Sequence, residues 1–162
     1  MSSSRPDTAA TNRDVDSYEN IDKFIEAEEA TTYDNLLSDG SISNADVRDR
    51  YGGSGLHYIP SIGRYKKDVD TDILLSYLLT CDPPADVNGI TTYSGSTPMW
   101  NAAYWNITSA VKVLIDFGGD RTIKSNSNDY SNPNSTPLDI AKTNNNHQET
   151  IKMLTECFPS EE

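Results

Sequence analysis

A short motif recurs along this chain and constrains its fold more than any other feature. Residues 97–103 read Thr-Pro-Met-Trp-Asn-Ala-Ala, residues 136–141 read Thr-Pro-Leu-Asp-Ile-Ala, and residues 54–57 read Ser-Gly-Leu-His, a degenerate third copy. A loop and an amphipathic stretch follow each copy, at residues 73–79, 110–117 and 151–158. In the middle stretch, apolar side chains at i, i+3 and i+4 predict one stripe of a helix. The chain is therefore expected to repeat a two-helix unit, and because one unit cannot bury its apolar face alone, neighbouring units must stack.

The motif has a physical reading as the start of a helix. The hydroxyl of Thr97 or Thr136 can cap the free amide groups of the first turn, and proline fits the first helical position, where no donor is lost. The following Met99 or Leu138 is predicted to be buried between helices of adjacent units. The small alanines that come next let the paired helices approach closely.

These residues resemble the Thr-Pro-Leu-His-x-Ala-Ala signature of ankyrin repeats. Two similar turns agree with this, since Asp86 and Asp120 are 34 residues apart, close to the ~33-residue ankyrin period. The resemblance implies an all-α solenoid of about four helix-turn-helix units with short β-turn fingers. It places the repeat domain at residues 16–158, after a disordered tail at 1–15 and before a frayed tail at 159–162. A first unit without its signature is expected at 21–30 and 32–37, with a closing turn at 44–47.

The copies are spaced more widely than the family period. Leu56 and Met99 are 43 residues apart, and Met99 and Leu138 are 39 apart, against a period of ~33. Insertions are therefore expected around 63–69, between the helices of one unit, and at 125–134, in the finger between two units.

Charge and cysteine usage exclude several classes of protein. The net charge of −12 disfavours binding to nucleic acid phosphates or to an anionic membrane, and it favours a neutral or basic protein partner. The sequence has no run of ~18 apolar residues, so no membrane span is predicted. Residues 1–10 lack the apolar stretch of a secretory signal. Cys81 and Cys157 are then expected to be free thiols in a reducing compartment, the cytoplasm, with the nucleus as an alternative.

The motifs of known chemistry are absent or incomplete. His57 is expected to bond backbone groups of adjacent turns, as the resemblance implies, and His147 is interpreted as a solvated loop residue. Residues 68–72 open like a calcium loop, but Ile73 stands where that loop needs glycine, so an aspartate there is expected to cap a helix instead. We expect no catalytic residue, no metal, no cofactor and no small-molecule substrate, and therefore no enzyme.

The expected function is protein–protein recognition, as an adaptor or as a subunit of a larger assembly. The alternative is an effector or a direct protein inhibitor of an enzyme. Motif position assigns partner binding to the fingers and to the residues after the paired alanines: Tyr93, Ser94, Ser96, Tyr104, Trp105, Thr143 and Asn144. For Trp105 a second hypothesis stays open, in which it packs on the inserted loop 125–134 or on Tyr93.

Overall fold

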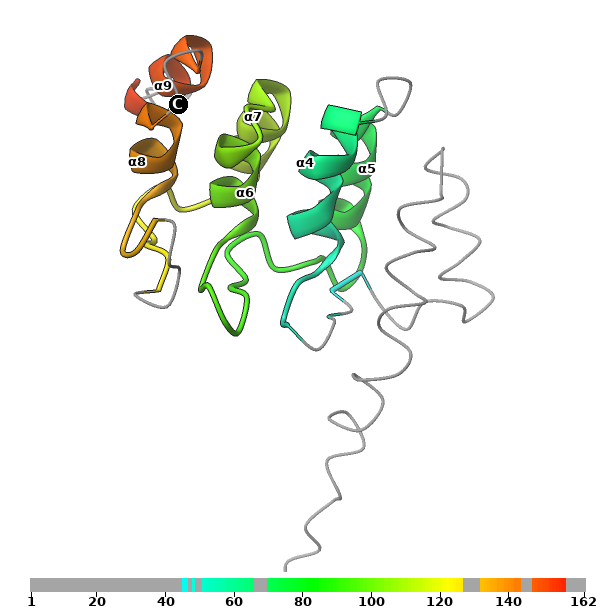
Figure 1. Cartoon of the computed structure of the whole chain (residues 1–162). Helices are drawn as coiled ribbons and strands as arrows, with labels where there is room; N and C mark the ends of the chain where they lie inside the picture. The colour runs from blue at the N-terminus through cyan, green and yellow to red at the C-terminus, as the bar shows by residue number, and fades with distance from the viewer. Residues whose placement is uncertain are drawn as a thin grey trace, which may run out of the picture.

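The described part of the protein consists of helix pairs in a row. A computed structural model describes residues 45–46, 48, 51–65, 70–126, 132–143 and 147–156. Within these ranges it contains six helices and no extended strand: α4 (Gly55–Tyr65), α5 (Thr71–Thr80), α6 (Pro98–Tyr104), α7 (Thr108–Asp116), α8 (Pro137–Lys142) and α9 (Gln148–Thr155). The predicted all-α solenoid is confirmed for these three pairs (Figure 1). The expected first unit and both tails lie outside the described residues, apart from Ala45 and Asp46 of its closing turn.

The helices form two rows that run along the solenoid. Helix α6 packs against both α4 and α8, and these three make up what we call the inner row. Helix α7 packs in the same way against α5 and α9, which make up the outer row, and Figure 1 shows the connecting fingers extending from one end of the pairs. None of the helices in the described part has the length and apolar character needed to cross a bilayer.

Capping side chains set where the inner helices begin, as the motif predicts. The hydroxyl of Thr97 accepts a hydrogen bond from the backbone N–H of Trp100 at 3.1 Å, and Pro98 occupies the first turn. Thr136 forms a reciprocal capping box, in which its hydroxyl accepts from the N–H of Asp139 while the Asp139 carboxylate accepts from the N–H of Thr136. Asp70 caps α5 by accepting from the N–H groups of Asp72 and Ile73, which confirms the capping role expected in residues 68–72.

Replacing Thr136 by alanine should destabilise the protein by about 1 kcal/mol, because the substitution removes the hydroxyl that caps the helix and that donates to the Asp139 carboxylate. Urea denaturation followed by circular dichroism measures this change. Thr155→Ala, at the exposed end of α9, is the control and should change the stability by less. Equal losses in the two variants would mean that the capping box does not stabilise α8.

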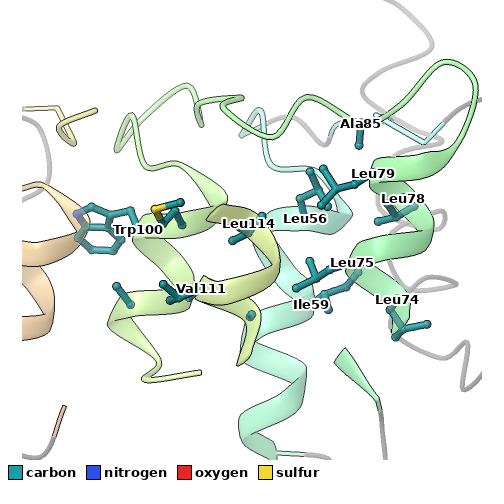
Figure 2. Close-up of a cluster of buried hydrophobic side chains, with 14 of the residues drawn as sticks. Leu56, Ile59, Leu74, Leu75, Leu78, Leu79, Ala85, Trp100, Val111 and Leu114 are labelled. Atoms are coloured by element: carbon teal, nitrogen blue, oxygen red, sulfur yellow. The ribbon is translucent and has the colours of Figure 1, made fainter. Parts of the chain in front are cut away.

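The core lies between the two rows and continues from unit to unit. Leu56 and Ile59 of α4 face Leu75 of α5, and Leu114 of α7 continues the same cluster (Figure 2). Met99 is 1% exposed, as predicted. The prediction for Leu138 was wrong, because this residue is only half-buried: it belongs to the last described unit, and no further helix of the described chain packs on α8.

Backbone hydrogen bonds join successive fingers. The N–H of Thr92 donates to the carbonyl of Tyr51 at 2.7 Å, and the N–H of Asn126 donates to the carbonyl of Ser94 at 2.6 Å. Gly52 has a φ of +76°, and a Cβ there would meet the backbone N of Thr92 at 2.9 Å, so this close approach requires glycine. The fingers therefore form a continuous edge rather than separate loops.

The structure describes the two predicted insertions to different extents. Helix α4 has 11 residues against seven in α6, so the helix itself absorbs part of the extra length around 63–69. The insertion at 125–134 is described at both of its ends, where Ser125 bonds the backbone of Asn132 and Ser135. Helix α4 is therefore four residues longer than α6.

Candidate partner-binding surface

The end of α6 is fixed by a residue in the left-handed region. Asn106 has a φ of +57°, a conformation that asparagine tolerates, and the helix ends at Tyr104 just before it. The Asn106 side-chain carbonyl accepts a hydrogen bond from Thr150 at 2.8 Å, and Thr150 also bonds Thr108. Tyr104 and Trp105 are thereby held at a helix end that is tied to α7 and α9.

Three aromatic rings pack in sequence at this end of the inner row. The ring centroids of Trp100 and Tyr104 are 5.5 Å apart with an interplanar angle of 9°, which is a stacked pair. Tyr104 and Trp105 meet edge to face at 5.0 Å and 90°. Trp100 is buried, Tyr104 in the middle of the series is 40% exposed, and Trp105 is half-buried. A buried ring therefore supports two rings that reach the surface.

Trp100 takes the place that histidine holds in the family signature. Its indole Nε1 donates to the hydroxyl of Ser135 at 2.9 Å, so it links α6 to the finger that precedes α8. Figure 2 shows its indole lying between the ribbons of α6 and α8. Trp100 was not among the candidate site residues predicted from the sequence. Its spacing of four residues from Tyr104 could have indicated that the two rings stack on one face of a helix.

Trp105 contacts a residue that sequence reasoning also missed. The guanidinium carbon of Arg64, in the last turn of α4, lies 5.6 Å from the centroid of the Trp105 ring. The sequence suggested the loop 125–134 or Tyr93 as internal partners of Trp105, and it did not suggest Arg64. Arg64 contacts Trp105 from the last turn of α4. The motif could not predict this contact, because it does not specify how long α4 is.

The finger residues divide into exposed and buried ones. Tyr93 is 53% exposed and Ser94 is half-buried, as a surface role requires. Ser96 is buried, and its hydroxyl bonds those of Thr91 and Ser94 at 3.1 and 3.0 Å. Ser96 therefore maintains the shape of the finger, and the surface proposed below does not include it.

The last two predicted residues lie at the end of α8. Thr143 is exposed, and its hydroxyl donates to the carbonyl of Ile140 at 2.7 Å. Asn144 lies outside the described residues. Tyr104 and Trp105 thus lie at the C-terminal end of α6 and Thr143 at the C-terminal end of α8, while Tyr93 and Ser94 lie on the finger that leads into α6.

Both histidines are buried in this fold. His57 confirms the prediction, since its Nδ1 accepts from the N–H of Ser54 at 3.0 Å and its Nε2 bonds the carbonyl of Gly89 at 2.9 Å. Burial, followed by the nearby Arg48 guanidinium, lowers the pKa of His57 to about 4. The interpretation of His147 as a solvated residue was wrong, because it is buried before α9 and its Nδ1 has no hydrogen-bond partner in the described structure.

Metal-ligating side chains do not gather in the described residues. No group of three His, Cys, Asp or Glu residues there could hold a metal ion. The carboxylate of Asp70 caps α5. Asp68 lies outside the described residues. The surface described above offers aromatic faces, hydroxyls and one guanidinium, and aromatic residues and arginine are enriched at protein interfaces in general.

Comparison with known proteins identifies the family. The model of ankyrin repeats in three copies matches residues 66–161, more than half of the chain, and no curated protein matches. Ankyrin repeats are in general protein–protein interaction modules, and the family is typically non-catalytic. With its capped two-helix units, stacked in two rows and joined by β-turn fingers, this chain belongs to the ankyrin repeat family.

Proposed function

We propose that this chain is a non-catalytic binding module, an adaptor or a subunit of a larger assembly, whose protein partner contacts the open side of the inner row. The observation that carries the proposal is the aromatic series at the end of α6, in which buried Trp100 supports exposed Tyr104 and half-buried Trp105. Side chains already held in place lose little conformational entropy when a partner binds, so more of the contact energy contributes to affinity. Aromatic side chains are also frequent anchors of interfaces.

The proposed contact surface follows the inner row across two units. It consists of the finger residues before α6, the residues at the end of that helix and those at the end of α8, namely Tyr93, Ser94, Tyr104, Trp105, Thr143 and Asn144. The net charge of −12 favours a partner that is neutral or basic overall, and association with a basic partner should slow as the salt concentration rises.

Replacing Trp105 by alanine should weaken partner binding by at least about 30-fold, the equivalent of ~2 kcal/mol for an aromatic anchor. The partner is first obtained by cross-linking and affinity capture from cells, then purified, and the affinity is measured by calorimetry. Tyr104→Ala should weaken binding in the same direction, because it removes the ring that supports Trp105.

Ile73→Ala is the matched control for these variants. Ile73 is as exposed as Tyr93 but lies on the outer row, so its loss should leave the affinity unchanged. Circular dichroism must show the same helix content in all variants. Unchanged affinity in both aromatic variants would contradict the proposed surface. A captured enzyme whose activity falls on binding would favour the inhibitor alternative over the adaptor.

A further inference from the structure

Charge is divided unequally between the two rows of helices. The described residues include ten Asp and Glu, and only Asp139 among them lies on an inner-row helix, where its carboxylate is occupied by the capping box. The inner helices carry two cations, Arg64 and Lys142. The described residues also include seven Lys and Arg, so their net charge is −3. Most of the net charge of −12 of the chain therefore comes from the other residues of the sequence. The inner row is therefore locally cationic in an acidic protein.

Arg64 is the inner-row cation best placed to bind a partner. Its side chain is exposed, it lies over the ring of Trp105, and no described carboxylate is within ion-pair distance of it. A guanidinium that stacks on an aromatic face keeps its in-plane N–H donors available, and their spacing matches the two oxygens of a carboxylate.

The charge of Arg64 also contributes to the electrostatics of His147, a residue two units away. Burial lowers the pKa of His147, a hydrogen bond to the carbonyl of Ala103 opposes that shift, and the charge of Arg64 lowers the pKa further. No described carboxylate contributes to it. The charge of Arg64 thus also acts on the imidazole at the start of α9.

We propose that Arg64 and Trp105 together receive an Asp or Glu side chain of the protein partner. The guanidinium binds the carboxylate through two N–H groups, and the rings of Trp105 and Tyr104 pack against the methylene groups of the same side chain. This proposal rests on the proposed function and deepens it. A partner that is neutral or basic overall would insert one acidic residue here, because its carboxylate would meet the Arg64 guanidinium, which has no described carboxylate within ion-pair distance.

Collisional quenching of tryptophan fluorescence tests the local potential without a partner. Trp100 and Trp105 are the two tryptophans of the chain, and Trp100 is buried, so Trp105→Phe isolates the signal of Trp100. Relative to the quenching of free indole by each ion, iodide should quench Trp105 more strongly than caesium does, in spite of the net charge of −12. Arg64→Gln should remove that preference, while Lys112→Gln on the outer row should leave it intact. Equal quenching by the two ions, or no effect of Arg64→Gln, would overturn the proposal.

Peptide binding tests the recognised group directly. A short acetylated peptide with one glutamate between alanines is titrated into the ¹⁵N-labelled protein, and the same peptide with glutamine is the control. The glutamate peptide should shift the indole N–H of Trp105 and the Nε–H of Arg64, with at least a fivefold weaker response in Arg64→Gln. Identical shifts with the glutamine peptide would overturn the proposal.

The purified partner separates this inference from the proposed function. Arg64→Gln should weaken its binding at least tenfold, in addition to the effect of Trp105→Ala. If Trp105→Ala weakens partner binding and Arg64→Gln does not, the binding surface stands and the acidic contact is wrong. If neither variant weakens binding, the surface itself is wrong.

Discussion

Lowering the pH from 7 to 4 should destabilise the folded protein by about 3 kcal/mol through His57 alone, since each unit of pKa shift corresponds to about 1.4 kcal/mol. The pKa of this imidazole falls from 6.5 in the unfolded chain to about 4 in the fold. The folded state therefore binds the proton more weakly than the unfolded state does. The contribution of His57 is complete above about pH 6.5 and is lost progressively as the pH falls toward 4.

The physical cause is the set of contacts around the ring. His57 is 1% exposed, so a charge on it would be desolvated, and the Arg48 guanidinium beside it opposes a second positive charge. The Ser54 N–H donates to Nδ1, so Nε2 carries the proton and donates to the Gly89 carbonyl. A proton added to Nδ1 would displace the Ser54 hydrogen bond. Protonation is therefore unfavourable both electrostatically and geometrically.

Urea denaturation at a series of pH values between 4 and 8 measures the effect, and an NMR titration of the His57 ring in the native protein measures its pKa independently. His57→Asn should be less stable at pH 7 but should lose less stability between pH 7 and 4. His147→Asn is the comparison, because the pKa of His147 is also lowered by burial and should account for a separate part of the slope. A native His57 pKa near 6.5 would contradict the prediction.

Met99→Ala should destabilise the protein by about 2–5 kcal/mol, because it removes a side chain that is 1% exposed and leaves a cavity between units. Leu138 holds the same motif position one unit later but is only half-buried. Leu138→Ala should therefore cost clearly less than Met99→Ala. The comparison isolates the effect of stacking, since the two residues share a motif, a helix position and a similar size.

Thermal and urea unfolding of both variants, followed by circular dichroism, provide the measurement. For a domain of this size a loss of a few kcal/mol is a large share of the total stability. Equal losses would mean that Leu138 is as well covered as Met99 in solution. An unchanged melting temperature of Met99→Ala would place Met99 outside the core.

The sequence by itself determined the repeating unit, because the signals that define it are local. Thr97 and Thr136 cap helices through atoms within three residues of themselves, and Pro98 and Pro137 sit where a lost N–H costs nothing. His57 was assigned correctly because its place in the motif brings it next to the adjoining turn. The apolar stripes predicted α5, α7 and α9 to within a few residues, since a period of 3.6 is a property of the chain and not of its neighbours.

Only the tertiary structure decided which of these residues reach the surface and what they contact. Ser96 is buried and Leu138 is partly exposed, because burial depends on which unit stacks on which and not on the motif. His147 is buried, and its ring hydrogen-bonds the carbonyl of Ala103 in the preceding unit. The pairing of Arg64 with Trp105 joins residues 41 positions apart, at the ends of two helices of unequal length. The motif specifies the residues within one unit. It does not specify how the helix ends of two neighbouring units lie relative to each other, and the candidate binding surface depends on that arrangement.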